Sequence, residues 1–351
     1  MSDIINIENY KIGTNQSVFV IAEVGVNHNG DLELAKKLIK EASRCGANCV
    51  KFQTFKAEKL VVNDAPKAEY QLKTTSKDES QLEMLQKLEM DTDKYNEIIK
   101  CCKEEGVLFI STPYNIEDAD FLETLGVSAY KLASMHAAEP WFARYVANKK
   151  KPIILSTGMS TLSEIDLTVR AIKETGNSDL ILLQCTTNYP SRMEDTNLLA
   201  MKTMSKTFNL NVGYSDHTEN DIACITSVAL GAKVIEKHFT LDKSLPGPDH
   251  TTSATPDEFR NLVKNIRNAE KSLGLSVKQP CEIEKINKIG MRRSIVAKCD
   301  IDKGIKITEE MIALKRPSTG ISSLYVDEII GKKTLNKILK DEMFKWNDFG
   351  E

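Results

Sequence analysis

The pattern that decides the fold is completed by the stretch Lys233-Val234-Ile235-Glu236-Lys237-His238. It is the last of eight short runs rich in branched apolar residues, each followed by a segment with helical periodicity. Strands that alternate with helices form parallel sheets, and eight such units favour a closed barrel over an open sheet. The expected strands are 18–23, 49–53, 107–112, 129–134, 152–157, 180–186, 211–215 and 233–238.

A change in the pattern after residue 274 predicts the end of the barrel. Residues 275–290 have weak apolar periodicity and contain Pro280, which is typical of a linker. From Met291 onward, short apolar runs are interrupted by turns such as Asp302-Lys303-Gly304, as expected for a small β-rich domain. We therefore expect an α/β chain: a (β/α)8 TIM barrel over 1–274, a linker over 275–290 and a β-rich domain over 291–351. About 60 residues give marginal stability alone, so this last domain is expected to dock elsewhere.

Composition and charge exclude several classes of protein. The formal charge of −3 gives no general attraction to nucleic acid. The eight cysteines are scattered without the paired spacing of a metal site, which fits a reducing cytoplasm. The first ten residues do not resemble a secretory signal, and no run approaches the roughly 18 apolar residues of a membrane span. We expect a cytoplasmic protein that binds neither nucleic acid nor membrane.

All five histidines follow predicted strands, where barrel enzymes place their catalytic groups. His217 and His238 end adjacent strands, so their imidazoles could hold one divalent ion and leave positions for water and substrate. Such an incomplete shell suits Mn²⁺ or Mg²⁺ better than structural Zn²⁺. The alternative is that both rings only hydrogen-bond their neighbours. The other three histidines are His28, His136 and His250.

Two lysines, Lys51 and Lys131, interrupt otherwise apolar strands, so each must point either into the barrel mouth or outward to the helices. An unpaired buried ammonium is costly, so each requires an anionic ligand or a carboxylate such as Glu23 or Glu236. Glu23 ends the first strand, where it could move protons or form an ion pair. Hydroxyls at the strand ends suggest a phosphate or carboxylate pocket, although each alone is an ordinary helix cap. They are Ser111, Thr112, Ser134, Ser156, Thr157, Thr186, Thr187 and Ser215.

In order, these motifs resemble the sialic acid synthase family of phosphoenolpyruvate-dependent nonulosonic acid synthases. The resemblance spans residues from about 15 to 345. The matching segments are Ala22-Glu23-Val24-Gly25-Val26-Asn27-His28-Asn29-Gly30, Lys51-Phe52-Gln53-Thr54, Ser111-Thr112-Pro113, Ser156-Thr157-Gly158-Met159, Gln184-Cys185-Thr186, Tyr214-Ser215-Asp216-His217, Glu236-Lys237-His238-Phe239-Thr240, Gly247-Pro248-Asp249-His250 and Lys315-Arg316-Pro317.

The resemblance implies a reaction and residue roles. The family joins phosphoenolpyruvate to the open-chain aldehyde of an N-acylated mannose-type sugar and releases phosphate. It implies that His217 and His238 bind Mn²⁺ or Mg²⁺ and that Glu23 is the acid/base group. The phosphoenolpyruvate ligands it implies are Lys51, Thr112, Lys131, Ser134, Ser156 and Ser215. The other implied substrate-binding residues are Gln53, His136, Thr187, Tyr189 and Asp249.

The last domain resembles the antifreeze-like, or SAF, module of this family. In the family it caps the barrel of the partner subunit, which implies a homodimer with swapped SAF domains. The arginine matching Arg316 then reaches the sugar's N-acyl group.

Two departures from the family concern the sugar. His136 stands where an acidic residue is common, and Thr187 stands where Asn is often found. The stretch 65–81 is more similar to legionaminic acid synthases, which accept 2,4-diacetamido-2,4,6-trideoxymannose in place of N-acetylmannosamine. Both sugars remain open. The alternative functions are a carbohydrate-binding protein without catalysis and another phosphoenolpyruvate-dependent aldol-type synthase, which would need a second cation cluster for a phosphosugar.

Overall fold

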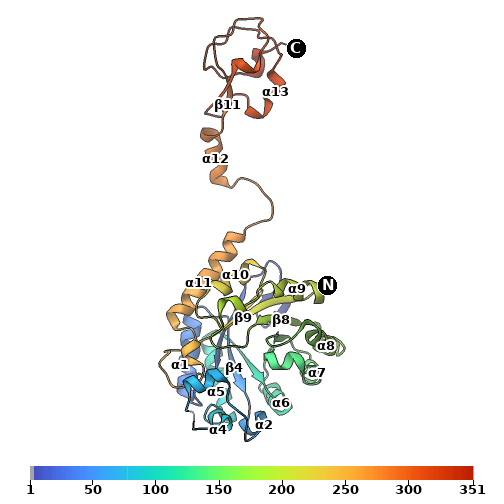
Figure 1. The fold of residues 1–351 in the computed structure, drawn as a ribbon, viewed down its shortest axis with the longest axis vertical. Coiled ribbons are helices and arrows are strands. Elements are labelled where there is room, and N and C mark those ends of the chain that lie inside the picture. Colours follow the sequence, from blue (N-terminus) through green and yellow to red (C-terminus); the bar gives the residue numbers. More distant parts are fainter. Residues whose placement is uncertain (1–3, 77, 351) are drawn as a thin grey trace. The chain divides into compact units, whose positions relative to one another are not determined.

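The computed structural model of the chain, which describes residues 4–76 and 78–350, contains all eight predicted strands. They form one parallel sheet in the order β5-β4-β3-β10-β9-β8-β7-β6, and β5 and β6 at its two ends lie next to each other. The sheet is therefore a nearly closed barrel, which confirms the predicted fold class (Figure 1). The strands are β3 (Phe19–Gly25), β4 (Cys49–Thr54), β5 (Leu108–Pro113), β6 (Tyr130–Leu132), β7 (Ile153–Ser156), β8 (Leu180–Cys185), β9 (Asn211–Asp216) and β10 (Val234–His238).

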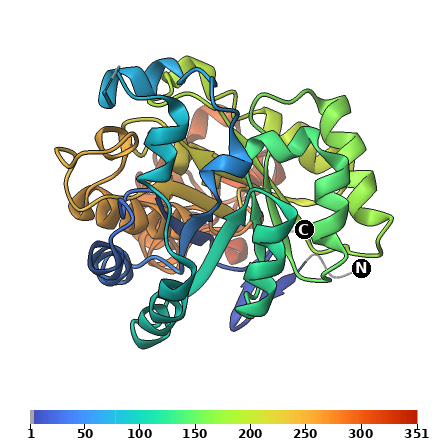
Figure 2. The same ribbon diagram turned by 90° about the horizontal axis from the view of Figure 1, so that it is seen from below.

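Helices cover the outside of this barrel (Figure 2). The first begins where Asp31 accepts hydrogen bonds from the backbone N–H groups of Glu33 and Leu34 and satisfies two free donors of the first turn. No helix in the described chain is long and apolar enough to cross a membrane. The covering helices are α1 (Leu32–Arg44), α5 (Tyr95–Glu104), α6 (Ile116–Thr124), α7 (Pro140–Ala147), α8 (Leu162–Lys173), α9 (Ala200–Phe208), α10 (Ile222–Ala229) and α11 (Pro256–Leu273).

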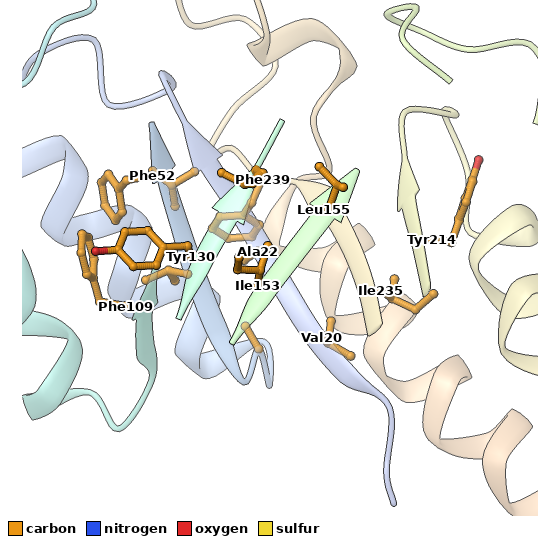
Figure 3. Packing of buried hydrophobic residues seen from close by; sticks show 14 of the residues in the cluster. Val20, Ala22, Phe52, Phe109, Tyr130, Ile153, Leu155, Tyr214, Ile235 and Phe239 are labelled. Atoms are coloured by element: carbon orange, nitrogen blue, oxygen red, sulfur yellow. The ribbon is translucent and has the colours of Figure 1, made fainter. Parts of the chain in front are cut away.

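Alternate residues of the strands point outward and form the main core with the helices. Figure 3 shows this packing, in which the rings of Phe52 and Phe109 have centroids 5.6 Å apart. Val20 and Ile235 lie in the same cluster on β3 and β10. Side chains alternate between the two faces of a strand. The residues that alternate with these outward-facing ones must therefore face the barrel interior.

The interior is apolar in its amino-terminal half. Short strands β1 (Ile5–Ile7) and β2 (Tyr10–Ile12) form an antiparallel hairpin that the sequence analysis did not predict. Three hairpin isoleucines, Ile5, Ile7 and Ile12, belong to the same buried cluster as the inward-facing residues. The hairpin thus packs against the interior core, and the charged inward residues such as Glu23 and Lys51 lie toward the opposite end. The barrel members of the cluster are Phe19, Ile21, Cys49, Leu108, Ile110, Ala129, Ile154, Ile181, Leu183 and Val234.

The connection from β4 to α5 is long and carries its own small core, which includes Val26, Phe55 and Met84. Its elements are α2 (Ala57–Leu60), α3 (Glu69–Thr74), α4 (Gln81–Gln86) and the single 3₁₀ turn η1 (Thr92–Lys94). Three further 3₁₀ turns follow β6, β8 and β10. They are η2 (Ser134–Ala138), η3 (Met193–Asp195) and η4 (His250–Thr252).

The chain divides into two compact units, 1–274 and 275–351. The second unit pairs β11 (Ser294–Ala297) with β12 (Ile312–Lys315) in an antiparallel sheet and has its own core, which includes Ile295 and Phe344. Helix α12 (Glu282–Met291) lies in the segment expected as a linker. The remaining elements of this unit are η5 (Glu309–Met311), η6 (Ser323–Tyr325), α13 (Val326–Ile329) and η7 (Trp346–Asp348).

Shortening a buried side chain of the hairpin should destabilise the whole barrel. Ile12 is fully buried, so Ile12→Ala removes packed atoms and leaves a cavity that costs about 2–5 kcal/mol of unfolding free energy. The exposed Ile222 supplies the control, because Ile222→Ala should change the stability by less than about 0.5 kcal/mol. Urea unfolding followed by circular dichroism measures both. Equal effects of the two substitutions would contradict the packing role of the hairpin.

Candidate active site

Seven of the eight inward-facing rows of the barrel end in a polar side chain at the carboxyl end of the strand, and the row on β8 ends in Cys185. On β3, Glu23 follows Ile21, and on β10, Glu236 and His238 follow Val234. The row on β4 continues from Cys49 to Lys51 and Gln53. The rows on β5, β6, β7 and β9 end in Thr112, Lys131, Ser156 and Ser215. Together these residues line one cavity of about 190 Å³ at the end of the barrel where enzymes of this fold place their chemistry.

The two buried lysines pair with carboxylates inside this cavity. Lys51 Nζ lies 2.9 Å from Glu23 Oε2 and 3.7 Å from Glu236 Oε1. Lys131 Nζ lies 3.7 Å from the same oxygen of Glu236 and donates to Ser156 Oγ at 2.7 Å. Burial disfavours the Glu236 carboxylate, but Lys131 and Lys51 lower its pKa overall. Both carboxylate partners considered from the sequence are therefore present, and Glu236 lies between the two ammonium groups.

Glu23 is the carboxylate with the most strongly shifted proton affinity in this network. Its Oε1 accepts a hydrogen bond of 2.8 Å from Gln53 Nε2, and Tyr114 OH donates to Gln53 Oε1 at 3.1 Å. Burial, with the negative charge of Glu236, raises the pKa of Glu23 to about 7 against the opposing effect of Lys51. Near neutral pH both forms of this carboxyl are populated, which suits a group that accepts and returns a proton.

The imidazoles of His217 and His238 come together at the cavity wall, with ring centroids 5.3 Å apart. His217 Nδ1 lies 2.7 Å from the carbonyl oxygen of Thr186. Because a carbonyl only accepts, Nδ1 carries a proton, and Nε2 is the ring nitrogen that could bind a metal. Within the described residues, His238 Nδ1 has no hydrogen-bond partner, and the nearest carboxylate oxygen, from Asp249, is 3.7 Å away.

These two rings fit a divalent metal. Burial, together with His217, lowers the pKa of His238 well below its ordinary value, so that its ring is the neutral form that binds metals. In the part of the chain that the structure describes, no group of three or more His, Cys, Asp or Glu side chains could hold a metal. A metal bound here would therefore complete its shell with water and substrate oxygens.

A second compartment of about 360 Å³ adjoins the first and shares five of its lining residues. Its polar side chains are Gln71, Gln81 and Asp249, in addition to the shared ones, and burial raises the pKa of Asp249 to about 6. No lysine or arginine lines it among the side chains that the structure describes, a set without those of residues 69, 70, 73 and 77. The shared residues are Gln53, Tyr114, Met135, Tyr189 and His238. The apolar walls of its own are Val26, Phe55, Leu60, Val61, Met84, Leu85, Leu88 and Pro248.

The first cavity is also lined by Ser134, Thr187 and Tyr189. It therefore contains all the barrel residues to which the family resemblance gave a role, except two. Asp249 lines the second compartment. His136 lines neither compartment: its Nδ1 accepts a hydrogen bond from the backbone N–H of Ala133, and its ring packs 4.7 Å from that of Phe142. A direct contact of His136 with the sugar has no geometric support.

Arg316 belongs to the second unit, where its Nε donates to the Met291 carbonyl at 3.0 Å.

Sequence analysis missed five residues that line the first cavity, one of which is Ala133 directly after β6. Tyr114 and Met159 lie in the loops after β5 and β7, and Met135 lies in η2 after β6. Cys185 is buried and faces the cavity, with its Sγ 3.8 Å from His217 Nδ1. The alternation of side chains along β8 could have predicted this position, since Ile181 and Leu183, four and two residues earlier, face the interior.

A closed β/α barrel with this buried set of lysines, carboxylates and imidazoles defines a barrel enzyme with a site for an anionic substrate. Comparison with known families identifies which one. The model of the NeuB family matches residues 38–278, and that of the SAF domain matches residues 292–350. The chain belongs to the NeuB family, whose members are phosphoenolpyruvate-dependent nonulosonic acid synthases. It is therefore a condensing enzyme, and the alternative of a carbohydrate-binding protein without catalysis is set aside.

Individual relatives make different members of this product class. The chain is 44% identical to the N,N'-diacetyllegionaminic acid synthase of Campylobacter jejuni, over 94% of this chain and 99% of the relative. It is 38% identical to the pseudaminic acid synthase of the same species, over 96% and 98% of the two chains. A crystal structure of N-acetylneuraminic acid synthetase from Leptospira borgpetersenii superposes with a TM-score of 0.73 at 32% identity, covering 82% of this chain and 95% of the other.

Removal of the Glu23 charge should change how stability depends on pH. Because the pKa of Glu23 is about 7 in the folded protein and about 4.5 ordinarily, its contribution to stability is complete below pH 4.5 and is lost as the pH rises through 7. Glu23→Gln abolishes that loss. Relative to the wild type, the variant should gain stability on the order of 3 kcal/mol between pH 4.5 and pH 8.

Chemical unfolding with chelator present at several pH values tests this expectation. Glu219→Gln at an exposed position is the control and should show a difference from wild type that does not vary with pH. If the Glu23→Gln curve runs parallel to that of the wild type, the carboxyl is not perturbed as described.

Proposed function

We propose that the protein condenses phosphoenolpyruvate with 2,4-diacetamido-2,4,6-trideoxymannose and water, forming N,N'-diacetyllegionaminic acid and phosphate. The observation that carries this choice is the composition of the second compartment. It has apolar walls, three glutamines and the carboxyl of Asp249, and no cationic side chain among its described lining residues. A 6-deoxy sugar with two acetamido groups brings three methyl groups to apolar walls and two amides to glutamine side chains. The 44% identity to a legionaminic acid synthase supports the same choice.

N-acetylmannosamine is the second candidate, and the resemblance to the Leptospira borgpetersenii synthetase favours it. This sugar has hydroxyls at C4 and C6, which would lose water against Leu60, Met84 or Leu88 without a matching partner. A phosphosugar is disfavoured more strongly, because its phosphate needs a cation that the described lining residues do not supply.

In this proposal the first cavity binds phosphoenolpyruvate. Lys51 and Lys131 would contact its phosphate and carboxylate, and hydroxyl groups would donate the remaining hydrogen bonds. Phosphoenolpyruvate brings about three negative charges. The buried carboxylates Glu23 and Glu236 already offset the two lysines, so a divalent cation would improve the charge balance. The hydroxyls proposed to bind phosphoenolpyruvate are those of Thr112, Ser134, Ser156 and Ser215.

His217 and His238 would hold the Mn²⁺ or Mg²⁺, which supplies Lewis acidity toward the sugar aldehyde. The methylene carbon of phosphoenolpyruvate forms a C–C bond to that aldehyde carbon, water adds to the neighbouring carbon, and the C–O bond to phosphate breaks. Glu23 would take the proton of the water or return one to the new hydroxyl, consistent with its pKa of about 7. Tyr189, Thr187 and Asp249 would face the sugar.

A direct comparison of the two sugars tests the substrate assignment. With phosphoenolpyruvate and Mn²⁺, phosphate release should show a kcat/KM at least about tenfold higher for 2,4-diacetamido-2,4,6-trideoxymannose than for N-acetylmannosamine, since each lost methyl contact in an apolar pocket costs about that factor or more. Lys131→Met is the control and should release no phosphate with either sugar. A preference for N-acetylmannosamine would sink the choice of sugar, and no release with either would sink the reaction.

We also propose that the protein is a homodimer in which Arg316 of one subunit completes the sugar site of the other. The small size of the SAF domain and the family resemblance support this arrangement. Mixing Arg316→Ala subunits with Glu23→Ala subunits should restore roughly a quarter of the wild-type activity, because half of the random dimers are mixed and each has one complete site. Verified mixed dimers without activity would show that Arg316 acts in its own subunit.

A further inference from the structure

A buried ion pair lies directly behind the two histidines. On the neighbouring strands β9 and β10, Ser215 is paired with Glu236 and Asp216 with Lys237. Ser215 donates to Glu236 inside the barrel at 3.0 Å, whereas Asp216 and Lys237 point to the opposite, outer face of the sheet. There Cys224 on α10 donates its Sγ–H to Asp216 Oδ2 at 3.1 Å. The pair thus lies outside both compartments, one residue before each histidine.

Lys237 uses one of its three donors to bind Asp216 and the other two to hold the chain that follows His217. Its Nζ lies 2.5 Å from Asp216 Oδ2, 2.7 Å from the Thr218 carbonyl and 3.1 Å from the Asn220 carbonyl. Asp216 Oδ1 in turn accepts from the Thr218 backbone N–H at 2.9 Å. The segment 217–220 is therefore bound from both members of the pair, while His238 is the next residue after Lys237 on its strand.

We propose that the Asp216–Lys237 pair is a positioning pair that fixes the separation and orientation of His217 and His238, and so sets the affinity of the divalent-metal site. This inference rests on the metal role proposed above. Both side chains are at most 6% exposed, and a buried ion pair is seldom more stabilising than apolar residues of similar volume. A gain in stability therefore does not explain why charged residues lie here. The three hydrogen bonds from the pair to the backbone of Thr218 and Asn220, in contrast, restrict the position of the His217 imidazole directly before them.

The experiment is a titration of Mn²⁺ without substrates, in which the electron paramagnetic resonance signal of free Mn²⁺ reports the bound fraction. Lys237→Met should raise the Kd for Mn²⁺ by about 10–100-fold, the range found when groups that orient metal ligands are lost. At saturating Mn²⁺ the variant should recover most of its kcat with little change in the KM for phosphoenolpyruvate. A role only in stability would lower the unfolding midpoint and leave the Kd unchanged.

A second variant covers the case in which Lys237→Met leaves Asp216 too costly to fold. The double variant Asp216→Asn with Lys237→Met removes both charges and should still bind Mn²⁺ more weakly than the wild type. The matched control is Lys243→Met, which breaks the exposed pair with Glu258 and should keep the wild-type Kd. Wild-type affinity in either folded variant overturns the positioning role.

His217→Ala separates this inference from the proposed function on which it rests. Tight Mn²⁺ binding should disappear in that variant. If His217→Ala binds Mn²⁺ as the wild type does, the metal site itself is wrong and the positioning role falls with it. If His217→Ala loses the metal but the Lys237 variants do not, only the positioning role is overturned.

Discussion

The interaction on which the site depends is the sharing of one buried carboxylate, Glu236, by two buried ammonium groups. Lys51 and Lys131 approach its Oε1 from different strands, each at 3.7 Å. Unpaired charges at this depth would cost several kcal/mol each. The strands must therefore pair in a register that keeps each lysine beside its carboxylate. Any shift of one strand by a single residue would move its charged side chain to the outer apolar face. The charge network and the register of the barrel therefore require each other.

The rest of the barrel keeps this network at one end. The amino-terminal half of the interior is filled by apolar residues and the hairpin isoleucines, among them Ile7 and Ile12. Burial then has opposite effects on the acid and on the imidazole: it raises the pKa of Glu23 to about 7 and lowers that of His238. A carboxyl able to exchange a proton and a neutral ring able to bind a metal are thus produced by the same desolvation.

Particular residues show how far sequence reasoning reached. The eight strands followed from periodicity, whereas the direction of Lys51 and Lys131 was left open. Of the eight strand-end hydroxyls expected to form a pocket, five line the first cavity, and Ser111, Thr157 and Thr186 do not. His136 shows the limit, because its position after β6 was right but its ring turns toward Phe142. The direction of a side chain in a loop depends on the 3₁₀ turn η2 and on its neighbours, which no local pattern encodes. The hairpin β1–β2 was missed because three-residue strands give almost no periodic signal.

The sequence by itself determined the order of strands and helices and the family of the protein, because these depend on local spacing and on motifs. Only the tertiary structure decided which groups meet: that Lys51 contacts Glu23 and Glu236 together, and that Lys237 holds the loop after His217. Such pairings join residues up to about two hundred positions apart, and they exist only once the sheet has closed and its register has been set by the packing of both faces.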